Sequence, residues 1–215
     1  MKTKRSLLFT ALVLLFPVLA GAQIINGGFE DNFTGWTSLG NTGVVSAAMI
    51  DSQTFLPYSG DKMGAITYPT GFIWDNSLSQ SIVLGPDDNY LVFYYNFWTF
   101  DEAPFDSPGF TVQVNGTEVF SASAGDIGDG TVGSLDYTGW QEFCYDVSGF
   151  YSEESRLFTL QLQFNAGNNG DNQYPSGVFL DEVRLQAHPA PIPPTLFMLA
   201  SGLVGLIGIR RRRVR

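Results

Sequence analysis

Apolar and polar residues alternate one by one along several short stretches of this 215-residue chain. Residues 110–114 and 158–165 show the pattern most clearly. A period of two puts one face of a β-strand in the core and the other in solvent. Asn115-Gly116 follows the first stretch and suits a type I′ turn, in which both central residues take a positive φ. A β-hairpin is therefore predicted at this point.

No window of about a dozen residues keeps the apolar stripe of an amphipathic helix. Clusters of Gly, Pro, Asn and Asp separate the alternating stretches instead. Further strands are expected at residues 44–50, 63–68, 78–84, 90–99, 139–147 and 178–186. Without helices to cover a parallel sheet, two antiparallel sheets packed face to face are the stable solution. The fold class predicted from these patterns is an all-β sandwich.

Both ends of the chain stand apart from this pattern. Residues 1–22 hold three basic residues, an apolar run and a small-residue cleavage site, which is typical of a secretory signal peptide. At the other end, residues 188–195 form a Pro-rich linker, residues 196–209 an uncharged apolar helix and residues 210–215 a basic tail. Arginines favour the cytoplasmic side of a membrane, so the sandwich, residues 23–187, is expected on the outer side.

The order of proline motif, apolar helix and arginine cluster resembles the PEP-CTERM sorting signal of Gram-negative bacteria. Pro191, Pro193 and Thr195 match that motif, whereas Ile192 replaces its acidic residue and Pro194 its serine. The resemblance implies an exosortase-type processing enzyme as a partner. It also implies that the inner membrane holds the protein transiently before the protein reaches the cell surface or the exterior. A plain C-terminal anchor is the alternative.

Acidic side chains far outnumber basic ones between the two ends. All 21 Asp and Glu lie in residues 23–187, against Lys62, Arg156 and Arg184, so the formal charge of this part is 3 − 21 = −18. Such a surface repels nucleic acid and anionic membrane surfaces, which excludes both as binding partners, and it suits divalent cations. Cys144 is the single cysteine, so no internal disulfide is expected.

The sequence lacks the signatures of common enzyme sites. The one histidine, His188, lies in the Pro-rich linker, so neither a serine triad nor a histidine metal centre is expected. Asp101-Glu102 and Glu153-Glu154 are adjacent pairs in turn-like segments, where solvated charge explains them better than a glycosidase pair does. A non-catalytic protein is predicted, and a polysaccharide-acting enzyme on the same fold is the alternative.

Short motifs in the body resemble those of the galactose-binding-like jelly rolls, a group that includes carbohydrate-binding modules. They are NGGFE at residues 26–30, FTGW at residues 33–36, TGWQ at residues 138–141 and FLDEVRL at residues 179–185. The resemblance implies a two-sheet antiparallel jelly-roll sandwich, here flanked by the N-terminal signal peptide and the C-terminal apolar helix. Trp36 and Trp140 within these motifs are expected to be core anchors.

Asp181 is the carboxylate that most needs a partner. In the last predicted strand Phe179, Val183 and Leu185 share the side of the pleat on which Asp181 lies, so if they face the core then Asp181 does too, and Arg184 points to the opposite face. A buried carboxylate without a partner costs several kcal/mol or changes its protonation. Bound Ca²⁺ would satisfy it, and backbone N–H donors without a metal are the alternative.

The jelly-roll resemblance implies a specific set of Ca²⁺ ligands. In those folds a structural Ca²⁺ joins a glutamate of the opening motif, an aspartate of the closing motif and backbone carbonyls near a Ser-Gly turn. In this sequence the corresponding residues are Glu30, Asp181, Gly60 and Lys62. Structural Ca²⁺ is therefore the expected cofactor.

The stretch richest in aromatic residues, residues 90–98, has two different faces. One face is fully apolar or aromatic and is expected to be core. The other carries Tyr94, Asn96 and Trp98, which suit stacking on sugar rings and hydrogen bonding to hydroxyl groups. Trp74, in a nearby loop, is a second candidate platform. The alternative is that this strand is buried on both faces.

Together these patterns predict an exported, non-catalytic protein of the cell surface or the extracellular biofilm matrix. Exopolysaccharide is the candidate ligand. A purely structural surface protein with no small ligand is a further alternative.

Overall fold

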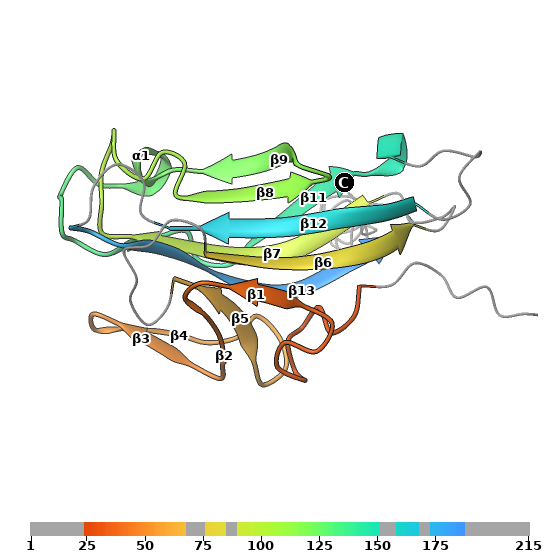
Figure 1. Ribbon diagram of the computed structural model, residues 1–215. Helices are drawn as coiled ribbons and strands as arrows, with labels where there is room; N and C mark the ends of the chain where they lie inside the picture. The colour runs from red at the N-terminus through yellow and green to blue at the C-terminus, as the bar shows by residue number, and fades with distance from the viewer. Residues whose placement is uncertain (1–23, 68–75, 85–89, 151–157, 168–172, 188–215) are drawn as a thin grey trace, which may run out of the picture.

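The computed structural model of the chain (Figure 1) describes residues 24–67, 76–84, 90–150, 158–167 and 173–187. Nearly all regular structure in these residues is β-strand, with one four-residue helix, α1 (Ala124–Ile127), and one short 3-10 helix (Ser148–Phe150). No helix in the same stretches is long and apolar enough to cross a membrane. The predicted signal peptide, linker, apolar helix and basic tail all lie outside the described residues.

Five antiparallel strands form the first sheet, in the order β1-β6-β12-β8-β9. They are β1 (Thr37–Leu39), β6 (Asn76–Leu84), β12 (Phe158–Ala166), β8 (Phe110–Val114) and β9 (Thr117–Ala122). The β8–β9 hairpin turns at Asn115 and Gly116, whose φ angles are 50° and 75°. The hairpin predicted from the Asn-Gly pair is confirmed, because both residues tolerate the positive φ that the turn requires.

Six strands form the second sheet. They are β2 (Thr42–Val45), β5 (Met63–Ile66), β13 (Ser176–Gln186), β7 (Tyr90–Thr99), β10 (Asp136–Tyr137) and β11 (Gln141–Asp146). A separate two-stranded ribbon joins β3 (Ala48–Ile50) to β4 (Gln53–Phe55). The single strand predicted at residues 44–50 is therefore wrong, because β2 and β3 replace it. The other predicted strands begin and end within two residues of their expected bounds.

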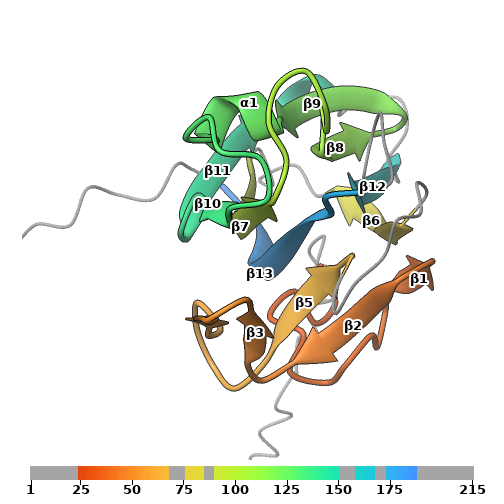
Figure 2. The same ribbon diagram turned by 90° about the vertical axis from the view of Figure 1, so that its left-hand side faces the viewer.

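The two larger sheets pack face to face (Figure 2). From β5 to β8 each new strand joins the opposite sheet, so neighbouring strands come from distant parts of the chain. This interleaved connectivity is that of a jelly roll. Apolar side chains from both inner faces fill the space between the sheets, and Phe93, Phe97, Phe110 and Phe164 are fully buried there. The predicted all-β, two-sheet antiparallel jelly-roll sandwich is confirmed for the described residues.

A second, smaller apolar cluster lies on the outer face of the six-stranded sheet, under the β3–β4 ribbon. Phe55 of the ribbon contacts Phe179 of β13 with 5.2 Å between ring centroids, and Trp98 of β7 belongs to the same cluster. Two short strands cannot bury an apolar face alone, so the ribbon is stable only against the sheet. Trp36 is buried in the main core as predicted, whereas Trp140 is half-buried beside the second cluster.

Candidate functional site

The outer face of β7 carries the three residues predicted to contact a ligand, and the structure buries two of them. Trp98 is 1% exposed and Asn96 is 4% exposed. Trp98 is covered because it packs in the cluster beneath the β3–β4 ribbon, with Phe55. The prediction that Asn96 and Trp98 lie on an open face is therefore wrong, and only Tyr94 reaches the surface. Trp74 lies outside the described residues.

An exposed aromatic surface forms around Tyr94. The ring of Tyr58 stacks on that of Tyr94, with 3.6 Å between centroids and 13° between planes, and Tyr58 keeps 45% of its surface exposed. Trp140 stands edge-on to Tyr58 at 6.1 Å, and its Nε1–H donates a 3.0 Å hydrogen bond to the carbonyl of Leu56. Leu56 itself is 60% exposed. We call Leu56, Tyr58, Tyr94 and Trp140 the aromatic surface.

Tyr58 was not identified from the sequence as a candidate ligand-binding residue, because it belongs to no periodic pattern. It lies in the loop of residues 56–62 between β4 and β5, in a Pro-Tyr-Ser-Gly stretch that reads as a turn. The loop crosses the outer face of the sheet because the backbone N–H of Ser59 donates a 3.0 Å hydrogen bond to Asp181 on β13. Asp181 is the register partner of Tyr94. This contact places Tyr58 above Tyr94.

Carboxylate and guanidinium groups border the aromatic surface. The Tyr94 hydroxyl donates a hydrogen bond to Glu142, its register partner on β11. That bond, more than any other cause, raises the pKa of Tyr94, so the phenol stays protonated. The Arg184 guanidinium lies over the Tyr94 ring, 5.6 Å from its centroid. Cys144, two residues along β11 from Glu142, is exposed.

A β-bulge in β13 decides which side chains reach this surface. The register with β7 shifts between Asp181 and Arg184, and Glu182 takes a positive φ of 50°. An extra residue in one strand turns the following side chains to the other face. Val183 packs in the main core and Arg184 lies on the outer face, as expected. Phe179 and Asp181 also lie on the outer face, so the expectation that they share the inward side with Val183 is wrong.

Asp181 is fully buried, but beneath the loop of residues 56–62 on the outer face and not on the core side as expected, and both of its oxygens accept backbone hydrogen bonds. Oδ2 accepts the Ser59 N–H at 3.0 Å, and Oδ1 accepts the Glu182 N–H at 2.8 Å. Burial nevertheless dominates over these bonds and raises the pKa of Asp181 to about 6. The backbone donors that were the alternative to a metal are therefore present, but they leave the ionised carboxylate at a net cost.

The other residues of the predicted Ca²⁺ site gather at the same loop. Glu30 Oε1 accepts the backbone N–H groups of Asp61 and Lys62 at 2.7 and 3.1 Å. The Lys62 ammonium donates to the Glu30 carbonyl at 2.8 Å, so Lys62 offers only its own carbonyl to an ion. At Gly60, whose φ is +63°, an added Cβ would lie 2.0 Å from Glu30 Oε1, so only glycine fits. The loop therefore brings Gly60 and Lys62 next to Glu30, close to Ser59, whose backbone N–H is bonded to Asp181.

Glu182 is a carboxylate of this region that the sequence did not single out. It accepts a hydrogen bond from the Ser59 hydroxyl. A Cβ added at Gly28 would lie 3.6 Å from Glu182 Oε1 and 3.7 Å from Asp181 Oδ1, so these two oxygens face the same narrow space. Ca²⁺ prefers carboxylate and carbonyl oxygens, and Glu30, Asp181 and Glu182 supply carboxylates here, but their oxygens are not all gathered within 4.8 Å of one another as those of the next acidic group are.

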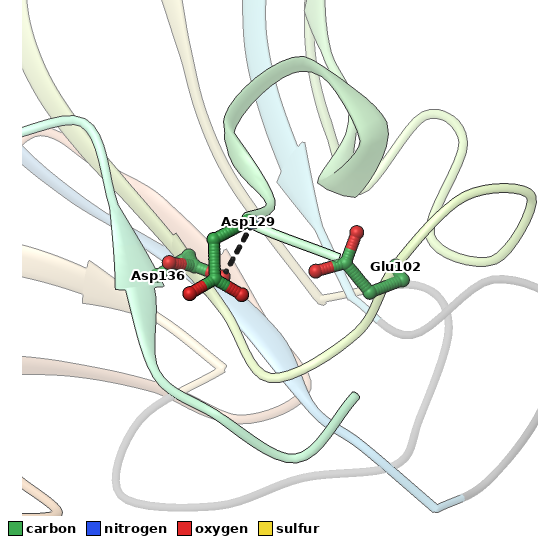
Figure 3. A group of neighbouring side chains, drawn as sticks. All are labelled: Glu102, Asp129 and Asp136. Atoms are coloured by element: carbon green, nitrogen blue, oxygen red, sulfur yellow. Dashed lines mark hydrogen bonds between the residues drawn. The ribbon is translucent and has the colours of Figure 1, made fainter. Parts of the chain in front are cut away.

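A second acidic group lies at the opposite end of β7 (Figure 3). Carboxylate oxygens of Glu102, Asp129 and Asp136 all lie within 4.8 Å of one another. Glu102 Oε1 accepts two backbone N–H groups of the loop after α1, at 2.8 and 3.0 Å, and Asp136 Oδ2 accepts the Asp129 N–H at 3.3 Å. These hydrogen bonds hold the loop after α1 in place.

Asp101, expected to be solvated, is instead 1% exposed, because the chain folds inward there.

Comparisons with known proteins give partial structural likenesses. No protein-family model and no curated protein matches the chain. The mannohexaose complex of CBM27-1 from Caldicellulosiruptor saccharolyticus is 17% identical with a TM-score of 0.41, over 78% of this chain and 98% of that one. CBM28, described as specific for non-crystalline cellulose, is 14% identical with a TM-score of 0.41, over 77% and 95%.

An enzyme domain gives a likeness of the same order. The enzymatically active domain of bacteriophage CBA120 tailspike protein 4 is 12% identical with a TM-score of 0.37, over 77% of this chain. The chain spans only 21% of the length of that protein. Likenesses of this size assign neither a ligand nor a reaction to this chain.

Proposed function

We propose that this protein is a non-catalytic module that binds polysaccharide on the aromatic surface. The observation that carries the proposal is the Tyr58 ring, which is stacked on Tyr94 and still 45% exposed. An exposed ring whose orientation is already fixed stacks on the apolar face of a sugar ring at little cost in conformational entropy. Glu142 and Arg184 beside it supply hydrogen-bond acceptors and donors for hydroxyl groups.

We further propose that the module acts outside the cell, at the surface or in the extracellular matrix. The export signal in residues 1–22 and the PEP-CTERM-like end in residues 188–215 support this location, with an exosortase-type enzyme as the processing partner. A structural Ca²⁺ held by Glu30, Asp181 and Glu182 would fix the loop of residues 56–62.

Replacing Tyr58 with alanine is expected to weaken polysaccharide binding about tenfold, which corresponds to ~1.4 kcal/mol. The reason is that one stacking face is lost while the fold is unchanged. Affinity gel electrophoresis of the full chain with a panel of soluble polysaccharides measures the effect. Tyr137→Ala is the matched control, because Tyr137 is 44% exposed but contacts Phe55 rather than Tyr94. Equal retention of both variants on every polymer contradicts the proposal.

The rival function, a polysaccharide-acting enzyme, is separated by product analysis. Binding without release of reducing ends supports the module. Release that one carboxylate substitution abolishes supports the enzyme instead. Glu102→Gln is the substitution to try first, because Glu102 stands beside two other carboxylates. Of the two carboxylate pairs noted in the sequence, Glu153-Glu154 lies outside the described residues.

A further inference from the structure

We propose that the aromatic surface selects polysaccharides that carry protonated amino groups, such as partly de-N-acetylated amino-sugar polymers. The inference deepens the proposed function and rests on it. It names the charge of the ligand, which stacking on Tyr58 alone leaves open.

Two carboxylates lie beside the aromatic stack on β11. Glu142 and Asp146 point to the same outer face as Tyr94, because they are the register partners of Tyr94 and Tyr90. Both are exposed. At ~3.4 Å per residue the four-residue interval puts them ~14 Å apart, so an extended chain of sugars that lies along β11 passes both.

Both carboxylates keep acceptor capacity for a ligand. The Ser148 backbone N–H donates a 2.8 Å hydrogen bond to Asp146 Oδ1, and hydrogen bonds from Ser148 lower the pKa of Asp146. Glu142 uses Oε2 for the Tyr94 hydroxyl, which leaves its other oxygen for a ligand. An ammonium group is a donor only, and a carboxylate is its best acceptor.

The basic groups of this region are few, and each of them donates a hydrogen bond within the protein. Among the described residues, Lys62 and Arg184 are the only lysine and arginine. Lys62 donates to the Glu30 carbonyl at 2.8 Å, and Arg184 donates to the Glu182 carbonyl at 3.2 Å while its guanidinium covers Tyr94. The overall charge of −18 for residues 23–187 adds a long-range field of the same sign. A polycation is therefore attracted, and a polyuronate is repelled.

The test compares oligosaccharides of different charge, of which the glucosamine and N-acetylglucosamine oligomers share a backbone. Glucosamine oligomers, N-acetylglucosamine oligomers of equal length and oligogalacturonate are titrated against the full chain in detergent by calorimetry, at about pH 6. The glucosamine oligomer is expected to bind about tenfold more tightly than its acetylated counterpart, and oligogalacturonate not to bind. The preference should shrink as the salt concentration rises from about 50 to about 500 mM, because salt screens exposed charges.

Matched substitutions separate the site from the general negative field. Glu142→Gln keeps an acceptor for the Tyr94 hydroxyl and is expected to reduce the preference about fivefold, and Asp146→Asn is expected to act in the same direction. Glu118→Gln changes the net charge equally, but Glu118 is exposed on β9 of the other sheet and should leave the preference intact. Equal effects of Glu118→Gln and Glu142→Gln overturn the inference.

Failure of this inference is distinguishable from failure of the proposed function. If both amino-sugar oligomers bind equally and Tyr58→Ala abolishes both interactions, charge selection is wrong and the binding surface stands. If a neutral glucan binds and neither amino-sugar oligomer does, charge selection is again wrong. If no polysaccharide binds the intact protein, both proposals fall together.

Discussion

Replacing Trp98 with alanine is expected to lower the free energy of unfolding by ~3–5 kcal/mol, the usual cost of removing a large buried aromatic side chain. Trp98 is 1% exposed and fills the space between the six-stranded sheet and the β3–β4 ribbon. The cavity would also remove the support of the ribbon, which packs Phe55 into the same cluster. In a domain of this size the loss corresponds to a fall in Tm of about 10 °C or more. Urea denaturation followed by tryptophan fluorescence measures it.

Trp98→Phe is the matched control for this substitution. The Trp98 Nε1–H has no hydrogen-bond partner among the described residues, so phenylalanine removes a donor whose burial is already costly. We expect Trp98→Phe to cost less than half as much stability as Trp98→Ala. At a temperature where Trp98→Ala is still folded, this alanine variant should bind polysaccharide like the unaltered protein. Lost binding with unchanged stability would return Trp98 to the ligand site and refute the structural role.

Removing Ca²⁺ is the second large perturbation, and a chelator is expected to lower Tm by about 5–10 °C. A ligand present at a hundred times its Kd stabilises the folded state by ~2.7 kcal/mol, which sets this scale. The ion would offset the free-energy cost of burying the Asp181 carboxylate. It would also fix the loop of residues 56–62, which is hydrogen-bonded to Glu30 and to Asp181. Differential scanning calorimetry with added Ca²⁺ and with excess chelator measures the difference.

Two substitutions make the chelator experiment specific. Asp181→Asn should abolish the response to Ca²⁺, because it removes the central charged ligand. Asp146→Asn should leave the response intact, because Asp146 is exposed on β11, away from Glu30. A Tm of the unaltered protein that is the same with Ca²⁺ and with chelator would remove the proposed metal.

The chelated protein is also expected to become more stable as the pH falls from about 7 to about 5. Burial raises the pKa of Asp181 from 3.8 to about 6, so the folded state holds this proton more tightly than the unfolded chain does. The contribution is complete below the unfolded pKa, at ~3 kcal/mol, and is lost as the pH rises through about 6, so about 1.3 kcal/mol of it separates pH 5 from pH 7. Urea denaturation at several pH values, compared with Asp181→Asn, isolates it. A difference between the two proteins that does not vary with pH contradicts the prediction.

Local patterns were enough to predict most of the fold. The alternation in residues 110–114 and the Asn115-Gly116 turn gave β8 and the β8–β9 hairpin with correct bounds at β8. The aromatic stretch of residues 90–99 coincides with β7. These features depend on neighbours in the sequence, so a single chain reveals them. The three-residue strands β1 and β4 were not predicted, because they are too short for a period to show.

The aromatic surface depends on contacts between distant residues, and for that reason it was only partly predicted. Alternation showed that Tyr94, Asn96 and Trp98 share a face, but not that the β3–β4 ribbon covers part of it. The bulge at Glu182 gave no signal either, because a positive φ usually marks glycine or asparagine. Tyr58 reached the surface through a hydrogen bond between residues 122 positions apart.

The place of β13 has a mechanical consequence. This last strand lies in the interior of its sheet, hydrogen-bonded to β7 on one side and β5 on the other. Tension applied to the chain beyond Gln186 would pull β13 lengthwise, against hydrogen bonds that run across the pull and are loaded all at once. Such a shearing geometry resists extension far better than one in which bonds open singly, so a domain held by its C-terminal end would withstand drag from a flowing polymer network.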